Sequence, residues 1–194
     1  MKIVGVGAGP GMLTGEAISA IENAKIIFGS KRAIELAKNH IRCTAYEISD
    51  YSLESIPENA VVLSTGDPML SGLGKFAKEG DQIIPGISSM QLACAKLGIC
   101  IDTIAIITAH SGDSDYVKKR LVDELRQGKN VFILPGTDFG VNEITGLLKS
   151  ESISCNISVC ERLGYPGERI FTGTVEKLHH NESGMYCVLI SSPE

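Results

Sequence analysis

Short runs of apolar, β-branched residues alternate with segments of helical periodicity through most of this chain. The run KIVGV (2–6) precedes a helical segment at 14–24, and KIIFG (25–29) precedes another at 30–39. A strand, a helix and a further strand in succession form a parallel crossover unit whose helices cover the sheet. The alternation therefore predicts an α/β fold that begins with a mostly parallel sheet.

The same pattern continues to about residue 98. Strands are predicted at 60–66 and 82–86, with a helix at 74–80 between them and another at 88–98. Thr14, Ser30 and Ser88 stand where helix N-caps are expected, and Gly98 stands where a helix ends. An acidic stretch at 47–58 shows neither period and is predicted to be irregular.

The second half starts as the first does and then changes. A strand is predicted at 103–110 and another at 130–136, each followed by an amphipathic helix. Val117, Leu121 and Leu125 share one face of the first helix, and Val141, Ile144 and Leu148 share one face of the second. From about residue 156 strands follow one another without helices, which indicates antiparallel pairing. We therefore expect two α/β lobes, 1–108 and 109–194, the second with a mixed sheet.

Composition limits the class of protein. The chain has 194 residues, a net charge of −5, no Trp and no long basic run, which argues against nucleic acid as a partner. No run approaches the ~20 apolar residues of a membrane span, and the start reads as a strand, so a cytoplasmic protein without membrane contact is expected. The six cysteines form no C-x-x-C pair, which favours reduced core thiols, with a metal site as the alternative; no metal ligand set is predicted.

Four predicted strands end in glycine-containing loops with few bulky side chains. These loops are GVGAGPG, STGDPMLSG, IPGISS and ILPGTDFG. Open α/β sheets bind ligands beyond the carboxyl ends of their strands, so the loops predict a ligand site at that edge. Asp67, the charged residue of the second loop, is expected to accept hydrogen bonds from a donor-rich or cationic ligand.

The first glycine loop has alternative interpretations. A G-x-G-x-x-G dinucleotide motif fits only with forced register, because Pro10 or Met12 falls where glycine is needed. A tight turn with a purely structural role is the other alternative. No P-loop and no G-x-S-x-G motif is present, which argues against nucleoside triphosphate and serine hydrolase chemistry. His110 follows a strand end and is a candidate for a structural, substrate-orienting or proton-transfer role.

Taken together, the segments VGVGAGPGMLT, STGDPMLSGLG and IPGISS resemble the three glycine motifs of the tetrapyrrole methylase family. The resemblance spans essentially the whole chain. It implies two α/β lobes with the active-site cleft between them. It also implies transfer of a methyl group from S-adenosylmethionine to a small tetrapyrrole, and a homodimer as the assembly.

Within that family, the segments IIFGSKRAIELA, GDPMLSGLGKF and PGISSMQLACAKLGI are most similar to the branch that methylates C5 of a corrin precursor. The implied reaction converts cobalt-precorrin-6B into cobalt-precorrin-7 in the anaerobic cobalamin pathway. A hand-over to a separate C15-methylating decarboxylase is implied as well. Another acceptor, such as a different corrin carbon or a diphthamide precursor, and a non-enzymatic binding protein remain as alternatives.

Matching motifs carry the family's site residues onto this chain. His110 is the candidate for proton transfer. The basic residues Lys31, Arg32, Lys75 and 118–120 are candidates to bind the carboxylates of the acceptor, or else belong to solvated helix faces. The residues expected to bind S-adenosylmethionine are Ala8, Pro10, Gly66, Asp67, Leu70, Ser88, Ser89, Leu134 and Leu163.

Overall fold

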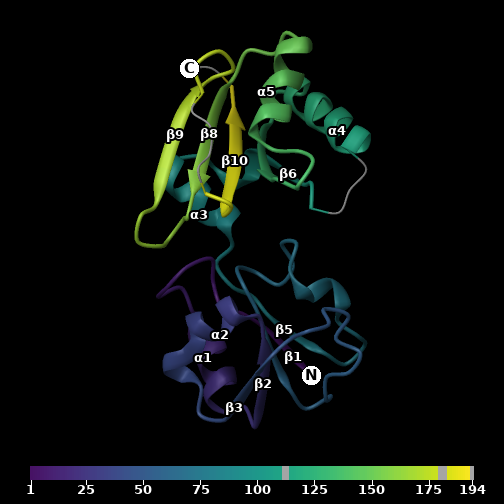
Figure 1. The fold of residues 1–194 in the computed structure, drawn as a ribbon, viewed down its shortest axis with the longest axis vertical. Coiled ribbons are helices and arrows are strands. Elements are labelled where there is room, and N and C mark those ends of the chain that lie inside the picture. The colour runs from purple at the N-terminus through teal and green to yellow at the C-terminus, as the bar shows by residue number, and fades with distance from the viewer. Residues whose placement is uncertain (111–113, 179–182, 193–194) are drawn as a thin grey trace. The chain divides into compact units, whose positions relative to one another are not determined.

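A computed structural model describes residues 1–110, 114–178 and 183–192 of the chain (Figure 1). By its internal contacts the chain divides into Met1–Leu92 and Ala93–Glu194, which we call the first and the second unit. Each unit has its own sheet and its own core. The predicted α/β class, with a parallel first sheet and a mixed second sheet, is confirmed.

The division between the units lies earlier than the sequence predicted. It falls within helix α3 (Ser89–Leu97), whereas we expected a boundary after residue 108. Strand β6 (Ile104–Thr108) accounts for the difference, because it pairs with β7 (Asn130–Leu134) of the second sheet. Sequence periodicity identifies a strand but does not say which sheet the strand joins.

The first unit contains a five-stranded sheet in the order β3-β2-β4-β1-β5, in which all neighbours are parallel. This order differs from that of the doubly wound dinucleotide-binding fold, so the topology argues against an NAD site at the first glycine loop. The elements of the first unit are β1 (Lys2–Gly5), α1 (Gly15–Glu22), β2 (Ile26–Gly29), α2 (Lys31–Ala37), the 3-10 turn η1 (Lys38–His40), β3 (Thr44–Glu47), β4 (Val61–Ser64), the 3-10 turn η2 (Leu73–Phe76), β5 (Gln82–Ile84) and the start of α3.

The first two helices begin at the predicted caps. The Thr14 Oγ1 accepts a hydrogen bond from the Ala17 N–H at 3.1 Å, and the Ser30 Oγ accepts one from the Ala33 N–H at 3.2 Å. Each hydroxyl satisfies a backbone donor that has no partner within its helix. The cap predictions for these helices are therefore confirmed.

The two faces of the first sheet are covered differently. Alternate strand residues such as Val4 and Leu63 pack with α1 and α2 in one core cluster. Their neighbours Ile3 and Val62 pack on the other face, against buried side chains of the irregular 47–58 segment that include the fully buried Leu53. The segment is therefore a cover for the sheet, although it has no helical or strand period.

One prediction for the first unit is wrong, and one strand was missed. The helix predicted at 74–80 is only the short 3-10 turn η2, and the strand β3 was not predicted at all. Gly74 donates its N–H to the Pro68 carbonyl at 2.9 Å, so the chain is held close to the preceding loop. An added Cβ at Gly74 would lie 2.8 Å from the same oxygen. The packing of this segment against the preceding loop therefore takes the place of the predicted helix. Local helix signals in the sequence do not report such a contact.

The second unit contains a mixed sheet in the order β6-β7-β10-β8-β9. The pair β6 and β7 is parallel and the remaining pairs are antiparallel, as the sequence predicted. The elements of the second unit are the end of α3, the 3-10 turn η3 (Ile101–Thr103), β6, α4 (Ser114–Arg126), β7, α5 (Val141–Ser150), β8 (Asn156–Glu161), β9 (Arg169–Thr174) and β10 (Tyr186–Ser191).

Helices α4 and α5 cover one face of the second sheet through the predicted side chains. Val117 and Leu121 of α4 and Ile144 and Leu148 of α5 are buried in one cluster with the sheet, and Leu125 packs against it. The amphipathic pattern therefore gave the correct buried face of both helices. No helix in the described residues is long and apolar enough to cross a membrane.

Candidate functional site

The predicted site residues of the first unit come together at one edge of its sheet. Strands β1, β4 and β5 are neighbours and run in the same direction, so their carboxyl ends lie side by side. The loops that follow them contain the three glycine motifs. We call this edge, with the segments 5–13, 65–74 and 85–90, the glycine edge.

Backbone contacts that only glycine permits join the three loops. An added Cβ at Gly86 would lie 2.3 Å from the Gly66 carbonyl oxygen, and one at Gly5 would lie 2.6 Å from the Gly86 nitrogen. Gly7 and Gly66 also exchange two hydrogen bonds, of 3.2 and 2.8 Å, although their strands have already ended. The glycines thus have a structural task, which is to let three backbones meet.

The hydrogen bonds of Asp67 explain why a carboxylate lies among these glycines. Its Oδ1 accepts a hydrogen bond from the Met69 N–H at 2.7 Å, and its Oδ2 accepts one from the Gly86 N–H at 3.1 Å. One oxygen shapes the turn of its own loop, and the other ties that loop to the next. Asp67 therefore holds the glycine edge together, and its contact with a ligand stays a prediction.

Ser88 has a similar structural task at the start of α3. Its N–H and its Oγ both donate to the Gln91 Oε1, at 2.8 and 2.9 Å, and its Oγ accepts from the Gln91 N–H at 3.2 Å. This reciprocal arrangement is a capping box. The Ser88 side chain is buried and serves the helix, whereas Ser89 is half-buried at the first helical position.

The remaining first-unit candidates lie on the same loops. Ala8 donates its N–H to the Ile87 carbonyl at 2.9 Å, so the first loop also contacts the third. Pro10 is exposed, and Leu70 is half-buried and donates its N–H to the Asp67 carbonyl at 3.2 Å. All the predicted first-unit residues are thus brought to one edge.

The composition of the glycine edge fits a cationic ligand with apolar parts. Asp67 is the one charged residue in its three segments. Met69 is 63% exposed and Ile87 is 38% exposed, so apolar side chains are available on the surface. A sulfonium nucleoside would meet no lysine or arginine of these loops, so the residues present fit S-adenosylmethionine. Sequence reasoning missed Met69 and Ile87, although both lie inside the motifs.

The predicted residues of the second unit also share one edge. Strands β6, β7 and β8 point in the same direction, because β10 pairs antiparallel with both β7 and β8. His110 follows β6, Leu134 ends β7 and Leu163 follows β8. His110 is exposed and Leu163 is buried. Their roles in binding and proton transfer stay predictions.

The loops of this second edge are also packed tightly. The Ala109 N–H donates to the Leu134 carbonyl at 2.9 Å, which extends the pairing of β6 and β7 to the residue before His110. An added Cβ at Gly136 would lie 2.2 Å from the Ala109 carbonyl oxygen. Glycine is therefore required in the motif LPG for the same reason as at Gly86. Residues 111–113 of the AHSGD segment lie outside the described part of the chain.

The loop after β8 is held by charged side chains. The Glu168 Oε2 accepts a hydrogen bond from the Gly164 N–H at 2.7 Å, and its Oε1 lies 2.8 Å from the Lys96 Nζ of α3. These two contacts hold the pKa of the Glu168 carboxyl below its usual range, and the hydrogen bond from the Gly164 N–H is the larger of the two causes. Glu168 was not a candidate, and no local motif in the sequence indicates its role.

A fully buried carboxylate lies at the start of this loop. Glu161, the last residue of β8, is fully buried, and its Oε2 contacts the Nη2 and Nε of Arg169 at 2.6 and 2.9 Å. Its Oε1 accepts a hydrogen bond from the Ser183 N–H at 3.1 Å. Both oxygens are therefore occupied by contacts within the second unit, as expected for a buried charge.

Four of the six cysteines are buried, whereas Cys43 is half-buried and Cys100 is exposed. Cys160 of β8 and Cys187 of β10 lie opposite each other in the sheet, and both are buried, as is Cys94 of α3. A hydrogen bond with Cys160 and then burial raise the pKa of the Cys187 thiol well above its usual range. Within the described residues no group of three or more His, Cys, Asp or Glu side chains is placed to hold a metal ion.

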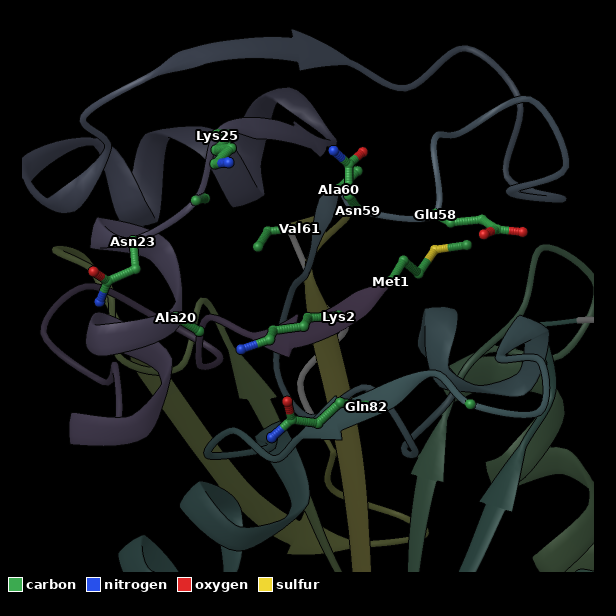
Figure 2. A pocket seen from close by; sticks show the side chains of 12 residues that line it. Met1, Lys2, Ala20, Asn23, Lys25, Glu58, Asn59, Ala60, Val61 and Gln82 are labelled. Carbon is green, nitrogen blue, oxygen red and sulfur yellow. The ribbon is translucent and has the colours of Figure 1, made fainter.

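A pocket of about 440 Å³ lies at the opposite edge of the first sheet, where its strands begin (Figure 2). Lys2 and Gln82 line it from the starts of β1 and β5, and Glu58 and Asn59 line it from the segment before β4. Cations, a carboxylate and amides are mixed there. None of the glycine motifs reaches this pocket, so it lies away from the candidate site.

Comparisons with known proteins agree with the motifs. The sequence model of the family described as Tetrapyrrole (Corrin/Porphyrin) Methylases matches residues 2–179. The chain is 32% identical over 207 residues to the probable cobalt-precorrin-7 C(5)-methyltransferase of Methanocaldococcus jannaschii, and the match covers 95% of each protein.

Two further relatives differ in how much of their length is matched. The chain is 28% identical to the precorrin-6Y C(5,15)-methyltransferase (decarboxylating) of a Sinorhizobium species, over 89% of this chain and 44% of that protein. The crystal structure of a cobalamin biosynthesis precorrin-6Y methylase from Archaeoglobus fulgidus matches with a TM-score of 0.73 at 27% identity. That match covers 100% of this chain and 98% of the other.

Proposed function

The chain belongs to the tetrapyrrole (corrin/porphyrin) methylases, and from this membership we propose that it methylates C5 of a cobalt-precorrin in cobalamin biosynthesis. The reaction would convert cobalt-precorrin-6B into cobalt-precorrin-7. One observation carries the proposal: the Methanocaldococcus protein named for this activity is 32% identical over 95% of both lengths. No described feature favours a diphthamide precursor or another corrin carbon as the acceptor.

The methyl donor of the proposal is S-adenosylmethionine, which when bound supplies a methyl group on a sulfonium cation. The residues that would hold it in the first unit are those of the glycine edge, among them Ala8, Gly66 and Leu70. An electron-rich acceptor carbon needs no protein nucleophile. The loops would contribute mainly alignment, an effect that can supply about 7–11 kcal/mol of a barrier.

Asp67 has a positioning role in this proposal. A carboxylate directly beside the sulfonium would stabilise the bound donor more than the transition state, in which the cationic charge disperses. The hydrogen bonds from the Met69 and Gly86 N–H groups support a different task for Asp67, which is to fix the loops. We propose that Asp67 orients the donor through these loops.

His110 is the proposed acceptor of the displaced proton. A carbon–carbon bond forms between the methyl group and C5, the sulfur–methyl bond breaks, and one proton leaves the macrocycle. The exposed position of His110 beyond the end of β6 supports the proposal, because an exposed side chain can pass a proton on to water.

Three further points stay predictions. A homodimer is expected because the family suggests it and two-fold dimers are the commonest assemblies. A cytoplasmic location is expected from the composition. A hand-over of the product to a separate C15-methylating decarboxylase is expected from the resemblance, and the Sinorhizobium relative is named for methylation at C15 as well as at C5.

The proposal is tested by incubating the protein with labelled S-adenosylmethionine and cobalt-precorrin-6B, followed by mass spectrometry and carbon NMR of the product. One added methyl group at C5 is expected. A methyl group at another carbon, or none, would refute the assignment. The His110→Gln variant should lower kcat while the melting shift caused by S-adenosylhomocysteine stays unchanged.

The Asp67→Asn variant tests the role of the glycine edge. Asparagine keeps the size of the side chain but places an NH2 group before one of the two backbone donors. A loss of about 1–3 kcal/mol of loop stability is expected, and with it most of the melting shift that S-adenosylhomocysteine produces. Asp123→Asn, an exposed position on α4, is the matched control and should keep the full shift.

A further inference from the structure

A second hollow lies beside the glycine edge, at the carboxyl ends of β2 and β4. Its volume is about 250 Å³. It contains one ammonium group, several hydroxyls and an apolar floor, and no carboxylate lines it. We call it the hydroxyl pocket. Its lining residues are Ser30, Tyr51, Leu63, Ser64, Thr65, Ser71, Gly72, Leu73, Lys75 and Phe76.

Lys75 supplies the positive charge of the hydroxyl pocket. Its Nζ lies 4.9 Å from the centroid of the Phe76 ring, a cation–π contact that holds the ammonium over the apolar floor. No ion pair of Lys75 is found among the residues that the structure describes. The pocket therefore has a net positive charge that its own walls do not neutralise.

Two of the other basic candidates, Lys118 and Arg120, differ from Lys75. The Lys118 Nζ lies 3.1 Å from the Asp115 Oδ1, and the Arg120 Nε lies 3.7 Å from the Glu124 Oε1, both pairs within helix α4. The hollows on this helix also contain carboxylates among their lining residues. These cations belong to a solvated helix face, which is the alternative that the sequence left open for them.

The hydroxyls of the pocket are fixed in place by the backbone. The Ser30 Oγ accepts from the Ala33 N–H, and the buried Ser64 Oγ accepts from the Leu73 N–H at 3.3 Å. A serine hydroxyl that accepts a hydrogen bond still has its own proton to donate. Ser71 has a φ of 54°, a left-handed conformation that costs a residue other than glycine about 1 kcal/mol or more. The chain therefore keeps a hydroxyl-bearing residue where glycine would be less strained.

The pocket is connected to the predicted donor site by one loop. Thr65, Ser71 and Gly72 line the pocket, and Asp67 and Leu70 lie between them in the chain. An added Cβ at Gly72 would lie 2.7 Å from both the Pro68 carbonyl oxygen and the Ser64 Oγ, so this loop is closely packed on the end of β4. A group bound in the pocket would thus contact the same loop that carries Asp67.

We propose that the hydroxyl pocket binds one carboxylate side chain of the tetrapyrrole acceptor, with Lys75 and the surrounding hydroxyls as donors. The inference rests on the proposed function, which supplies an acceptor with several carboxylate arms. Pockets that enclose a whole drug-sized ligand measure about 300–1,000 Å³. A volume of about 250 Å³ therefore suits one arm of the macrocycle and not the ring. The apolar floor accommodates the methylene groups of the arm, and the ammonium binds its charge.

The test compares two lysines that lie three residues apart. Lys75→Gln removes the charge of the pocket, and Lys78→Gln removes an exposed charge outside it. Binding of cobalt-precorrin-6B is measured by the change in corrinoid absorbance over a series of salt concentrations. Binding of S-adenosylhomocysteine is measured by calorimetry on the same proteins.

Lys75→Gln should raise the Kd for the corrinoid roughly five- to tenfold at low salt and reduce the salt dependence. It should leave the Kd for S-adenosylhomocysteine unchanged, and Lys78→Gln should leave both values unchanged. Thr65→Val, which replaces a hydroxyl by a methyl group of the same shape, should raise the corrinoid Kd by a smaller factor. A KM that rises with kcat unchanged would show the same effect in turnover.

Two results would overturn the inference, and they are distinguishable. If the wild-type protein methylates cobalt-precorrin-6B and Lys75→Gln binds it as tightly as Lys78→Gln does, the pocket does not hold an arm and the proposed function stands. If the wild-type protein binds S-adenosylhomocysteine but neither binds nor methylates the corrinoid, the proposed function and the inference are both refuted.

Discussion

The glycine edge of the first unit and the loop after β8 in the second unit are held in place by different means. In the first unit Asp67 ties two loops together through backbone N–H groups, and glycine contacts fix the rest. In the second unit Glu168 also accepts from a backbone N–H, but its other oxygen binds the Lys96 ammonium of α3. The glycine edge is thus fixed mainly by close backbone packing, whereas the loop after β8 depends on a charge pair.

This difference follows from the direction of the strands. Three adjacent parallel strands end at one edge in the first unit, so their loops meet backbone to backbone. In the second sheet β10 separates β7 from β8, so the loop after β8 has no parallel neighbour beside it. Side chains must hold it instead. The first edge should therefore respond most to added volume, and the loop after β8 should respond most to pH.

The largest effect is expected from Gly86→Ala. The Cβ of the new alanine would lie 2.3 Å from the Gly66 carbonyl oxygen. Because that oxygen belongs to the backbone, no side-chain rotation can relieve the clash. The free energy of unfolding should fall by about 3 kcal/mol, and binding of S-adenosylhomocysteine should be lost. Chemical denaturation and calorimetry measure the two effects.

Gly15→Ala is the matched control in the same unit. Gly15 begins α1, and an added Cβ there meets nothing within 4 Å. This variant should gain about 0.5–1 kcal/mol, because alanine loses less backbone entropy than glycine on folding. Equal losses from the two substitutions would show that the glycine edge is no more tightly packed than an exposed helix start.

The contrast between the edges also shows where sequence reasoning ends. The strands β1 and β4 and the helix α5 were predictable because their signals are local: β-branched runs, caps and an amphipathic face. The motif around Asp67 was predictable as a site. The hydrogen bond from the Gly86 N–H to Asp67 was not predictable, because a contact between residues 19 positions apart produces no local pattern in the sequence.

Other parts were missed for the same physical reason. The second unit's Glu168 and Lys96 are separated by most of the unit, and neither belongs to a recognisable pattern. Three of the four residues of β3 are exposed and the strand lies at the sheet edge, so it lacks the apolar run of a buried strand. The boundary within α3 depends on which sheet β6 joins, and that is a property of the fold as a whole.

A smaller, pH-dependent effect is expected at Glu168. Its pKa in the folded protein lies below the ordinary value of 4.5, first because of the Gly164 N–H and then because of Lys96. The carboxylate therefore adds stability above about pH 4.5, and this contribution is lost as the pH falls through the lower folded pKa. Glu168→Gln should cost about 1 kcal/mol or less at neutral pH, since the pair is partly exposed.

Hydrogen exchange of the β8 amides over a pH series measures this effect on the second unit. The wild-type protein and Glu168→Gln should differ at pH 7 and converge in strong acid. Arg126→Ala breaks an ion pair on the surface, between Arg126 and Glu151 at 2.7 Å, and is the matched control. If Glu168→Gln behaved as this control does at every pH, the loop after β8 would not depend on the charge pair.

The smallest effect concerns the thiols. The rate at which they are labelled reports whether strands β8 and β10 of the second sheet separate. Cys100 is exposed, whereas Cys155, Cys160 and Cys187 are buried. Burial raises the pKa of the Cys155 thiol to about 11, and the pKa of Cys187 is also raised, so these two thiols form few reactive thiolates at neutral pH.

N-ethylmaleimide should therefore modify Cys100 first and change the free energy of unfolding by no more than about 0.5 kcal/mol. Mass spectrometry of proteolytic fragments, with Cys100→Ser as the control, identifies the labelled residue. Early labelling of Cys160 or Cys187 would mean that β8 and β10 separate readily, and the second sheet would then be the less stable of the two as well as the more dependent on charge.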